Sequence, residues 1–291
     1  MVCNRYRVAG HCFSVFLDDN DSLLRSDMSA YEPFHVASSE TDLFSLTVKE
    51  VDDIPSGFVK TYHQQEGREE ISYGKFEDGR MGFCFLCQGQ VAGWLVCEDG
   101  YRQGTLLGTG IQRKLGFNNA VMILYALSAA SSQTALFHAS AISHHGRAYL
   151  FLGVSGTGKS THARLWQEHI DGAELVNDDN PVVRIIDGEV RVYGSPWSGK
   201  TPCYRNVEYP VGGIVALQQA PQNRIERMRP VKAYASLLYS ISGMRWDAKI
   251  ADGLHEMETE LVKRVSMWQL DCLPDAEAAR LCCQTVESVT K

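Results

Sequence analysis

The sequence predicts mixed α and β structure in two parts, a β-rich region over residues 1–115 and an α/β domain over residues 116–291. Short segments rich in aromatic and β-branched residues, separated by polar turns, fill most of the first hundred residues, which is typical of an antiparallel sheet with one solvent-facing side. Apolar strands and helical stretches follow, which is typical of an α/β fold. A glycine-rich loop at residues 153–160 lies between such a strand and such a helix.

Alternation of apolar residues and turn signals places the elements of the first region. We expect strands at residues 8–17, 44–51, 59–63, 71–76, 82–87 and 92–98. Polar or glycine-containing turns at residues 18–21, 77–80 and 88–90 separate some of them. An apolar stretch over residues 118–132 predicts a buried helix at the end of this series.

The second region begins with a predicted hairpin, whose two apolar strands cover residues 136–143 and 148–153. The glycine-rich loop and a helix over residues 159–169 come next. Asp187-Gly188 is typical of a type I′ turn between two further strands. We expect these and other strands at residues 174–176, 182–186, 189–193 and 214–217, and helices at residues 230–242, 248–264 and 274–288.

Composition excludes several classes of protein. The chain has 28 Lys and Arg against 35 Asp and Glu, giving a net charge of −7, which argues against a nucleic-acid partner that binds through clustered positive charge. No apolar run reaches the roughly 20 residues of a membrane helix, and no apolar signal-peptide core follows the first residues. We therefore expect a cytoplasmic protein without a membrane partner.

The nine cysteines favour buried thiols over disulfide bonds, because their number is odd and the chain is large. Cys84 and Cys87 form a Cys-x-x-Cys pair, but no second pair stands at zinc-ribbon spacing, so a metal or redox site is the weaker interpretation. His144 and His145 lie in a predicted hairpin turn, where the sequence shows no metal partner for them. Cys282-Cys283 falls in the predicted terminal helix.

The strongest functional signal is the run Gly153-Val154-Ser155-Gly156-Thr157-Gly158-Lys159-Ser160, which fits G-x-x-x-x-G-K-[ST]. Glycines let the backbone curl so that successive N–H groups surround phosphate oxygens. The following helix N-terminus adds its dipole. Lys159 supplies positive charge to the phosphates and the Ser160 hydroxyl is placed to bind Mg²⁺. We expect ATP and Mg²⁺ to be held by Gly153, Ser155, Gly156, Thr157, Gly158, Lys159, Ser160 and Thr161.

Two adjacent carboxylates, Asp178 and Asp179, end a predicted buried strand some twenty residues after the loop. Ligands of α/β folds lie beyond the carboxyl ends of strands, so these side chains are expected to face the phosphates. One carboxylate can hold Mg²⁺, and the other can accept a proton from an attacking hydroxyl. A polar turn is the alternative interpretation. His138, at the start of the hairpin, can be an active-site or a structural histidine.

The stretch from residue 138 to residue 179 resembles the catalytic domain of the HPr kinase/phosphorylase family, whose nucleotide fold is shared with ATP-dependent phosphoenolpyruvate carboxykinases. Three motifs carry the resemblance in the same order: His138 before the hairpin, the phosphate loop, and the strand ending in Asp178-Asp179. About forty residues match strongly. The resemblance implies a phosphoenolpyruvate carboxykinase/HPr kinase-like P-loop domain, with Asp178 as proton acceptor, His138 supporting it, Lys159 on the transferred phosphate, and Ser160 and Asp179 at the metal.

The resemblance has limits. The family's Pro-Gly-Arg-Asn signature and its metal-binding Glu segment have no counterpart here, and residues 193–200 take the place of the latter. Trp197 and Lys200 in that stretch are expected to contact the nucleotide, Trp197 by stacking on a base and Lys200 through phosphate. A surface turn anchored by Trp197 is the alternative. A homo-oligomer is compatible with the resemblance, because HPr kinases form rings.

The sequence therefore favours a kinase that transfers phosphate from Mg²⁺-ATP to a hydroxyl, either a serine of a protein or peptide or a small metabolite. The β-rich region is a candidate for acceptor recognition. A catalytically weak nucleotide-binding regulatory module is the alternative, favoured by the two missing family segments. A simple ATPase or GTPase is a third interpretation, and it lacks a base-selective motif.

Overall fold

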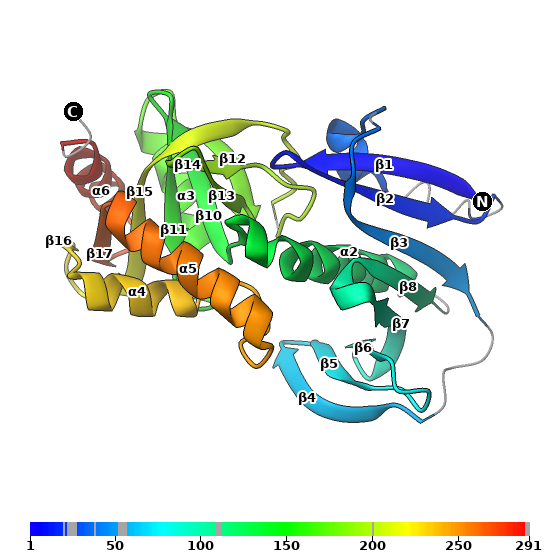
Figure 1. Cartoon of the computed structure of the whole chain (residues 1–291). Helices are drawn as coiled ribbons and strands as arrows, with labels where there is room; N and C mark the ends of the chain where they lie inside the picture. The colour runs from blue at the N-terminus through cyan, green and yellow to red at the C-terminus, as the bar shows by residue number, and fades with distance from the viewer. Residues whose placement is uncertain are drawn as a thin grey trace. The chain divides into compact units, whose positions relative to one another are not determined.

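The computed structural model describes residues 1–19, 21, 28–37, 39–51, 57–108, 112–199 and 201–288 (Figure 1). They group into two compact units, Met1–Ser128 and Ala129–Lys291. The sequence analysis divided the chain near residue 115. The structure instead groups helix α2 (Arg113–Ala129) with the first unit, where the Tyr125 hydroxyl donates a hydrogen bond to the Val8 carbonyl oxygen at 3.0 Å.

The first unit is built on one sheet of eight strands among its described residues. They are β1 (Val2–Val8), β2 (His11–Leu17), β3 (Asp42–Glu50), β4 (Val59–Glu66), β5 (Glu69–Lys75), β6 (Met81–Cys87), β7 (Gln90–Glu98) and β8 (Gln103–Gly108). The spatial order is β1-β2-β3-β8-β7-β6-β5-β4. The pairs β2–β3 and β3–β8 are parallel, so the expected wholly antiparallel sheet is wrong at these two places.

The expected strand over residues 8–17 is also wrong at its start, because β1 and β2 form a hairpin that turns at Ala9-Gly10. Both turn residues have positive φ, 49° and 78°, as a type I′ turn requires. Short 3₁₀ helices η1 (Met28–Phe34) and η2 (Asp99–Tyr101) lie in the connections. Cys84 is buried in β6, which agrees with the interpretation of this cysteine as a buried thiol.

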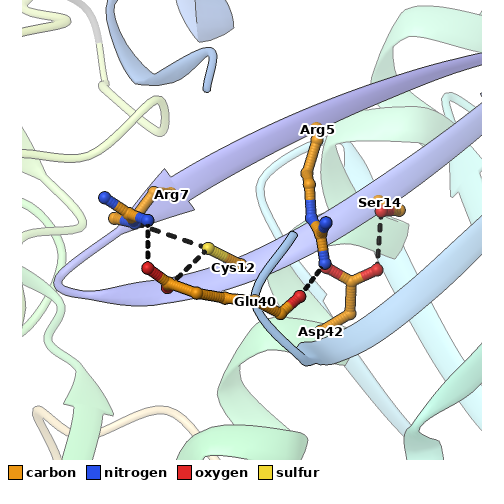
Figure 2. A network of polar contacts seen from close by, with 6 residues as sticks. All are labelled: Arg5, Arg7, Cys12, Ser14, Glu40 and Asp42. Carbon is orange, nitrogen blue, oxygen red and sulfur yellow. Dashed lines mark hydrogen bonds and ion pairs between the residues drawn. The ribbon is translucent and has the colours of Figure 1, made fainter. Parts of the chain in front are cut away.

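A polar network joins this hairpin to the chain that leads into β3 (Figure 2). It consists of Arg5, Arg7, Cys12, Ser14, Glu40 and Asp42. The Asp42 carboxylate accepts hydrogen bonds from Arg5 Nε at 2.9 Å and from Ser14 Oγ at 2.6 Å. These bonds tie both strands of the hairpin to the first residue of β3.

The second unit contains a sheet of nine strands among its described residues. They are β9 (Thr134–Leu136), β10 (Ala139–His144), β11 (Arg147–Leu152), β12 (Glu174–Asp179), β13 (Val182–Ile186), β14 (Glu189–Tyr193), β15 (Glu208–Gln219), β16 (Arg224–Arg227) and β17 (Met267–Cys272). The order is β12-β10-β11-β15-β14-β13-β9, with β17 paired to β15 and β16 to β17. Asp187 and Gly188 have φ of 50° and 82°, which confirms the predicted tight turn between β13 and β14.

Helices complete the second unit: α3 (Lys159–His169), α4 (Pro230–Leu238), α5 (Ala248–Arg264), α6 (Ala276–Ser288) and the 3₁₀ helix η3 (Ala130–Ser132). Helices α3 and α6 share a buried apolar cluster with strands β10, β11, β15 and β17, in which Trp166, Trp268 and Tyr149 are the largest side chains. Figure 1 shows α4 and α5 side by side. Among the described residues, no helix is both long enough and apolar enough to cross a membrane.

Candidate functional site

The register of the second sheet brings the predicted site segments to one edge. Ala139 of β10 pairs with Leu152, the last residue of β11, and also with Asp179, the last residue of β12. Both pairings are antiparallel, so β11 and β12 run in the same direction and end together. Adjacent strands lie about 4.8 Å apart, which puts the two strand ends about 10 Å from each other. The glycine-rich loop at residues 153–160 and the Asp178-Asp179 pair therefore leave the same edge of the sheet.

The loop after β11 has the backbone that its glycines predict. Gly156 and Gly158 have φ of 82° and 107°, where residues with a side chain are strained. The N–H and the hydroxyl of Thr157 both donate to the Val154 carbonyl oxygen, at 3.1 and 2.7 Å. Gly158 is the N-cap residue of helix α3, and no side chain forms a hydrogen bond at this cap. The helix N-terminus can therefore offer its N–H groups and dipole to an anion in the loop.

Lys159 points back into this loop. Its side chain is buried, and Nζ donates to the carbonyl oxygens of Gly153 at 2.9 Å and Val154 at 3.5 Å. A charged phosphate oxygen is a stronger acceptor for an ammonium group than a neutral carbonyl. Lys159 is thus held where an incoming phosphate would meet it.

The remaining loop candidates occupy the start of α3 and the loop surface. Ser155 and Ser160 are exposed, and Thr161 is half-buried. The Ser160 hydroxyl, in the first turn of the helix, is therefore accessible to a metal ion or to phosphate. The Thr161 hydroxyl is less accessible.

A cleft of about 680 Å³ adjoins the loop, a volume within the range of small-molecule sites. Its lining includes loop residues 153–157, the end of β15, and Tyr239 and Ser240 after α4. Gln219, at the end of β15, donates from Nε2 to the carbonyl oxygens of Gly156 at 3.2 Å and Thr157 at 3.4 Å. No sequence motif indicates Gln219, because its place beside the loop depends on the parallel pairing of β15 with β11.

The two aspartates have different surroundings. Asp178 is 3% exposed, and its Oδ1 accepts a hydrogen bond from Ser140 Oγ at 2.7 Å. The Asp179 side chain is 39% exposed, and its Oδ1 lies 3.7 Å from Nε2 of His138. Asp179 is thus the carboxylate of the pair that an external molecule can reach.

His138 lies between β9 and β10, rather than within one long strand as expected. Its N–H donates to the Ser240 carbonyl oxygen at 2.7 Å, so its backbone is tied to a residue that lines the cleft. Its imidazole is about one-third exposed and faces Asp179. The histidine and the exposed carboxylate therefore form a pair at the sheet edge.

The turn at residues 195–199 supports the aspartate pair. Asn177 Nδ2 donates to Ser195 Oγ and to the Trp197 carbonyl oxygen, both at 3.1 Å, and the Gly199 N–H donates to the Asp178 carbonyl oxygen at 2.7 Å. A Cβ on residue 199 would come within 2.8 Å of that oxygen, so glycine permits the approach. Sequence reasoning missed Asn177 and Ser195, whose role depends on this contact.

Trp197, which the sequence analysis placed against the nucleotide, is only 4% exposed. The hydrogen bond from Asn177 Nδ2 to its carbonyl oxygen holds the Trp197 backbone against β12, and its indole presents no open face to a base in this structure. Lys200, the other residue expected there, lies outside the described residues. The cleft beside the loop offers Tyr239 instead, whose side chain is 85% exposed.

A scan of the chain against models of known protein families gives no match. A search of the curated proteins likewise finds no relative. The interpretation of the site therefore rests on the residues and their arrangement.

Proposed function

We propose that the chain is a kinase that transfers the terminal phosphoryl group of Mg²⁺-ATP to a hydroxyl group. The observation that carries the proposal is that Ala139 pairs with both Leu152 and Asp179. Strand β11, which leads into the glycine-rich loop, and strand β12, which carries the two aspartates, therefore end at the same edge of the sheet. Phosphoryl transfer needs a phosphate-binding loop and a carboxylate within reach of the same phosphate.

The nucleotide half of the proposal fits the loop. Positive-φ glycines, the α3 N-terminus and the Lys159 ammonium form an anion-binding concavity. The adjoining cleft has room for the rest of a nucleotide, and the exposed Tyr239 ring offers a face on which a base can stack. Ser160 and a carboxylate of the acidic pair supply the oxygen ligands that Mg²⁺ prefers. When bound, Mg²⁺ would neutralise negative charge on the phosphate oxygens.

The acceptor half depends on Asp179. The resemblance gave the base role to Asp178, but the exposure of the two carboxylates favours Asp179, with His138 beside it. The Asp179 carboxylate takes the proton of the acceptor hydroxyl as the oxygen forms its bond to the terminal phosphorus. The bond from that phosphorus to the bridging oxygen breaks, and ADP leaves with the electron pair. Asp178, fixed by Ser140, holds the end of β12 in place.

The test is phosphate transfer from labelled Mg²⁺-ATP to free serine, other small hydroxyl compounds and serine-containing peptides. We expect transfer by the wild type, and a loss of about a hundredfold or more in Asp179→Asn with nucleotide binding retained. Lys159→Ala is expected to weaken nucleotide binding itself. Asp252→Asn, which changes an exposed aspartate of α5, is the matched control and should leave transfer unchanged.

Three results would count against this proposal. Absence of nucleotide binding removes its basis. Binding without transfer to any acceptor favours the regulatory module instead. A loss confined to Asp178→Asn, with Asp179→Asn active, returns the base role to Asp178.

A further inference from the structure

The end of β10 opposite the phosphate loop carries a second group of chemically capable side chains. His144 ends β10, and His145 follows it in the turn to β11. Cys283 and Glu287 lie on α6, four residues apart, so they project from the same face of the helix. The fold brings these two pairs together, although 137 residues lie between them in the sequence.

The ligand atoms of this group converge. His144 Nδ1 lies 2.6 Å from Glu287 Oε1 and 4.0 Å from Cys283 Sγ. One ligand atom from each of His144, Cys283 and Glu287 lies within 4.8 Å of the others. Neighbouring ligands of a tetrahedral zinc ion are about 3.3–3.6 Å apart, given bonds of about 2.0–2.3 Å. Small side-chain adjustments therefore suffice to place one ion between these atoms.

The second ring nitrogen of His144 fixes the role of the first. Nε2 lies 3.1 Å from the Asp171 carbonyl oxygen, which can only accept, so Nε2 carries a hydrogen. In the neutral ring, Nδ1 then carries a lone pair that faces Glu287 Oε1 and Cys283 Sγ. A metal-binding histidine typically donates its other N–H to a backbone carbonyl or a carboxylate in this way. The competing arrangement is a doubly protonated His144 paired with the Glu287 carboxylate.

We propose that His144, Cys283 and Glu287 bind a zinc ion, with His145 or a water molecule as the fourth ligand. His145 Nδ1 is 3.4 Å from Glu287 Oε1, and its ring is tilted by 32° against that of His144 with centroids 3.8 Å apart. A thiolate with imidazole nitrogens and a carboxylate is a donor set suited to zinc, whereas Mg²⁺ and Ca²⁺ prefer oxygen alone. As the metal–sulfur bond forms, the thiol proton of Cys283 passes to solvent.

The place of this cluster indicates a structural role. His144 and Ala139 are at opposite ends of β10, so the cluster lies about 17 Å along the strand from the edge with the phosphate loop. An ion there would fasten α6 to the β10–β11 hairpin.

The test uses the full chain without an affinity tag, stripped of metal with a chelator and then given zinc or cobalt. We expect one zinc ion to be retained per chain after gel filtration. Cobalt is expected to produce a near-ultraviolet thiolate-to-metal absorption band and the strong visible bands of a tetrahedral site. A wild type that retains no zinc, or whose cobalt spectrum lacks the thiolate band, would overturn the proposal without recourse to any variant.

Variants then identify the ligands. Cys283→Ser and Glu287→Gln should each weaken zinc binding by more than about tenfold. Removing only a hydrogen-bond partner of a metal ligand already costs about tenfold in affinity, so removing the ligand itself should cost more. Cys272→Ser, a partly buried cysteine of β17 outside the cluster, is the matched control and should bind as the wild type does. Circular dichroism establishes that each variant is folded. Equal zinc affinity of folded Cys283→Ser and the wild type overturns the assignment.

Discussion

Asp178 and Asp179 are neighbours in the sequence, yet Asp178 is buried and the Asp179 side chain is 39% exposed, because Asp178 lies inside β12 whereas Asp179 is its last residue. The buried carboxylate depends on the Ser140 hydroxyl at 2.7 Å. Ser140→Ala removes this charge-assisted hydrogen bond, so we expect the free energy of unfolding to fall by about 1.5–3 kcal/mol. Urea denaturation measures the difference.

Ser143→Ala is the matched control on the same strand. Ser143 Oγ donates to a neutral backbone oxygen, that of Glu174, at 3.3 Å, and its loss should cost about 1 kcal/mol or less. If both variants lose the same free energy of unfolding, the hydrogen bond from Ser140 to Asp178 is no stronger than the one from Ser143 to a neutral carbonyl oxygen, which contradicts the prediction.

Helix α3 carries a buried histidine that makes its packing sensitive to pH. His162 Nε2 accepts a hydrogen bond from Trp166 Nε1 at 3.1 Å, and its ring lies edge-on to Phe151 with centroids 4.7 Å apart. Burial lowers the pKa of His162 from 6.5 to about 4. Between these pH values the unfolded chain binds a proton that the folded chain does not, so the free energy of unfolding falls as the pH is lowered.

The size of this effect follows from the shift of about 2.5 pH units, which corresponds to about 3 kcal/mol lost on going from pH 6.5 to pH 4. Urea denaturation at about pH 7, 5.5 and 4.5 measures it. His162→Gln should lose most of the slope in this window, whereas His169→Gln, at the exposed end of the same helix, should retain it. An unchanged slope in His162→Gln contradicts the assignment.

At the scale of elements, the sequence predicted those helices, strands and turns that interactions between neighbouring residues determine. The bounds of α3 and the Asp187-Gly188 turn were both predicted, because a glycine-rich loop and a type I′ turn are specified by adjacent residues. Strands β8 and β17 were missed, since each pairs in parallel with a strand that is distant in the sequence. The loop and the aspartates of the site were found from motifs, but Gln219 and the partners of His144 depend on long-range packing that the sequence pattern does not reveal.

At the scale of the whole molecule, the tryptophans distinguish the two units. Trp94 is in the first unit, whereas Trp166, Trp197, Trp246 and Trp268 are in the second, so intrinsic fluorescence reports mainly on the unit that contains the phosphate loop. A ligand that binds only the folded state raises the free energy of unfolding by about 2.7 kcal/mol at a hundred times its dissociation constant. We expect Mg²⁺-ATP to raise the fluorescence-detected midpoint in urea accordingly.

Lys159→Ala tests whether this stabilisation arises at the loop. The Lys159 ammonium donates to loop carbonyl oxygens, and in the proposed function it would donate to phosphate instead, so the variant should lose most of the shift at the same nucleotide concentration. Both proteins are measured at the same zinc concentration, because zinc bound at the proposed site would move the same midpoint. If Mg²⁺-ATP shifts the urea midpoint equally in both proteins, the nucleotide binds elsewhere in the chain. The loop would then have no part in the proposed kinase activity.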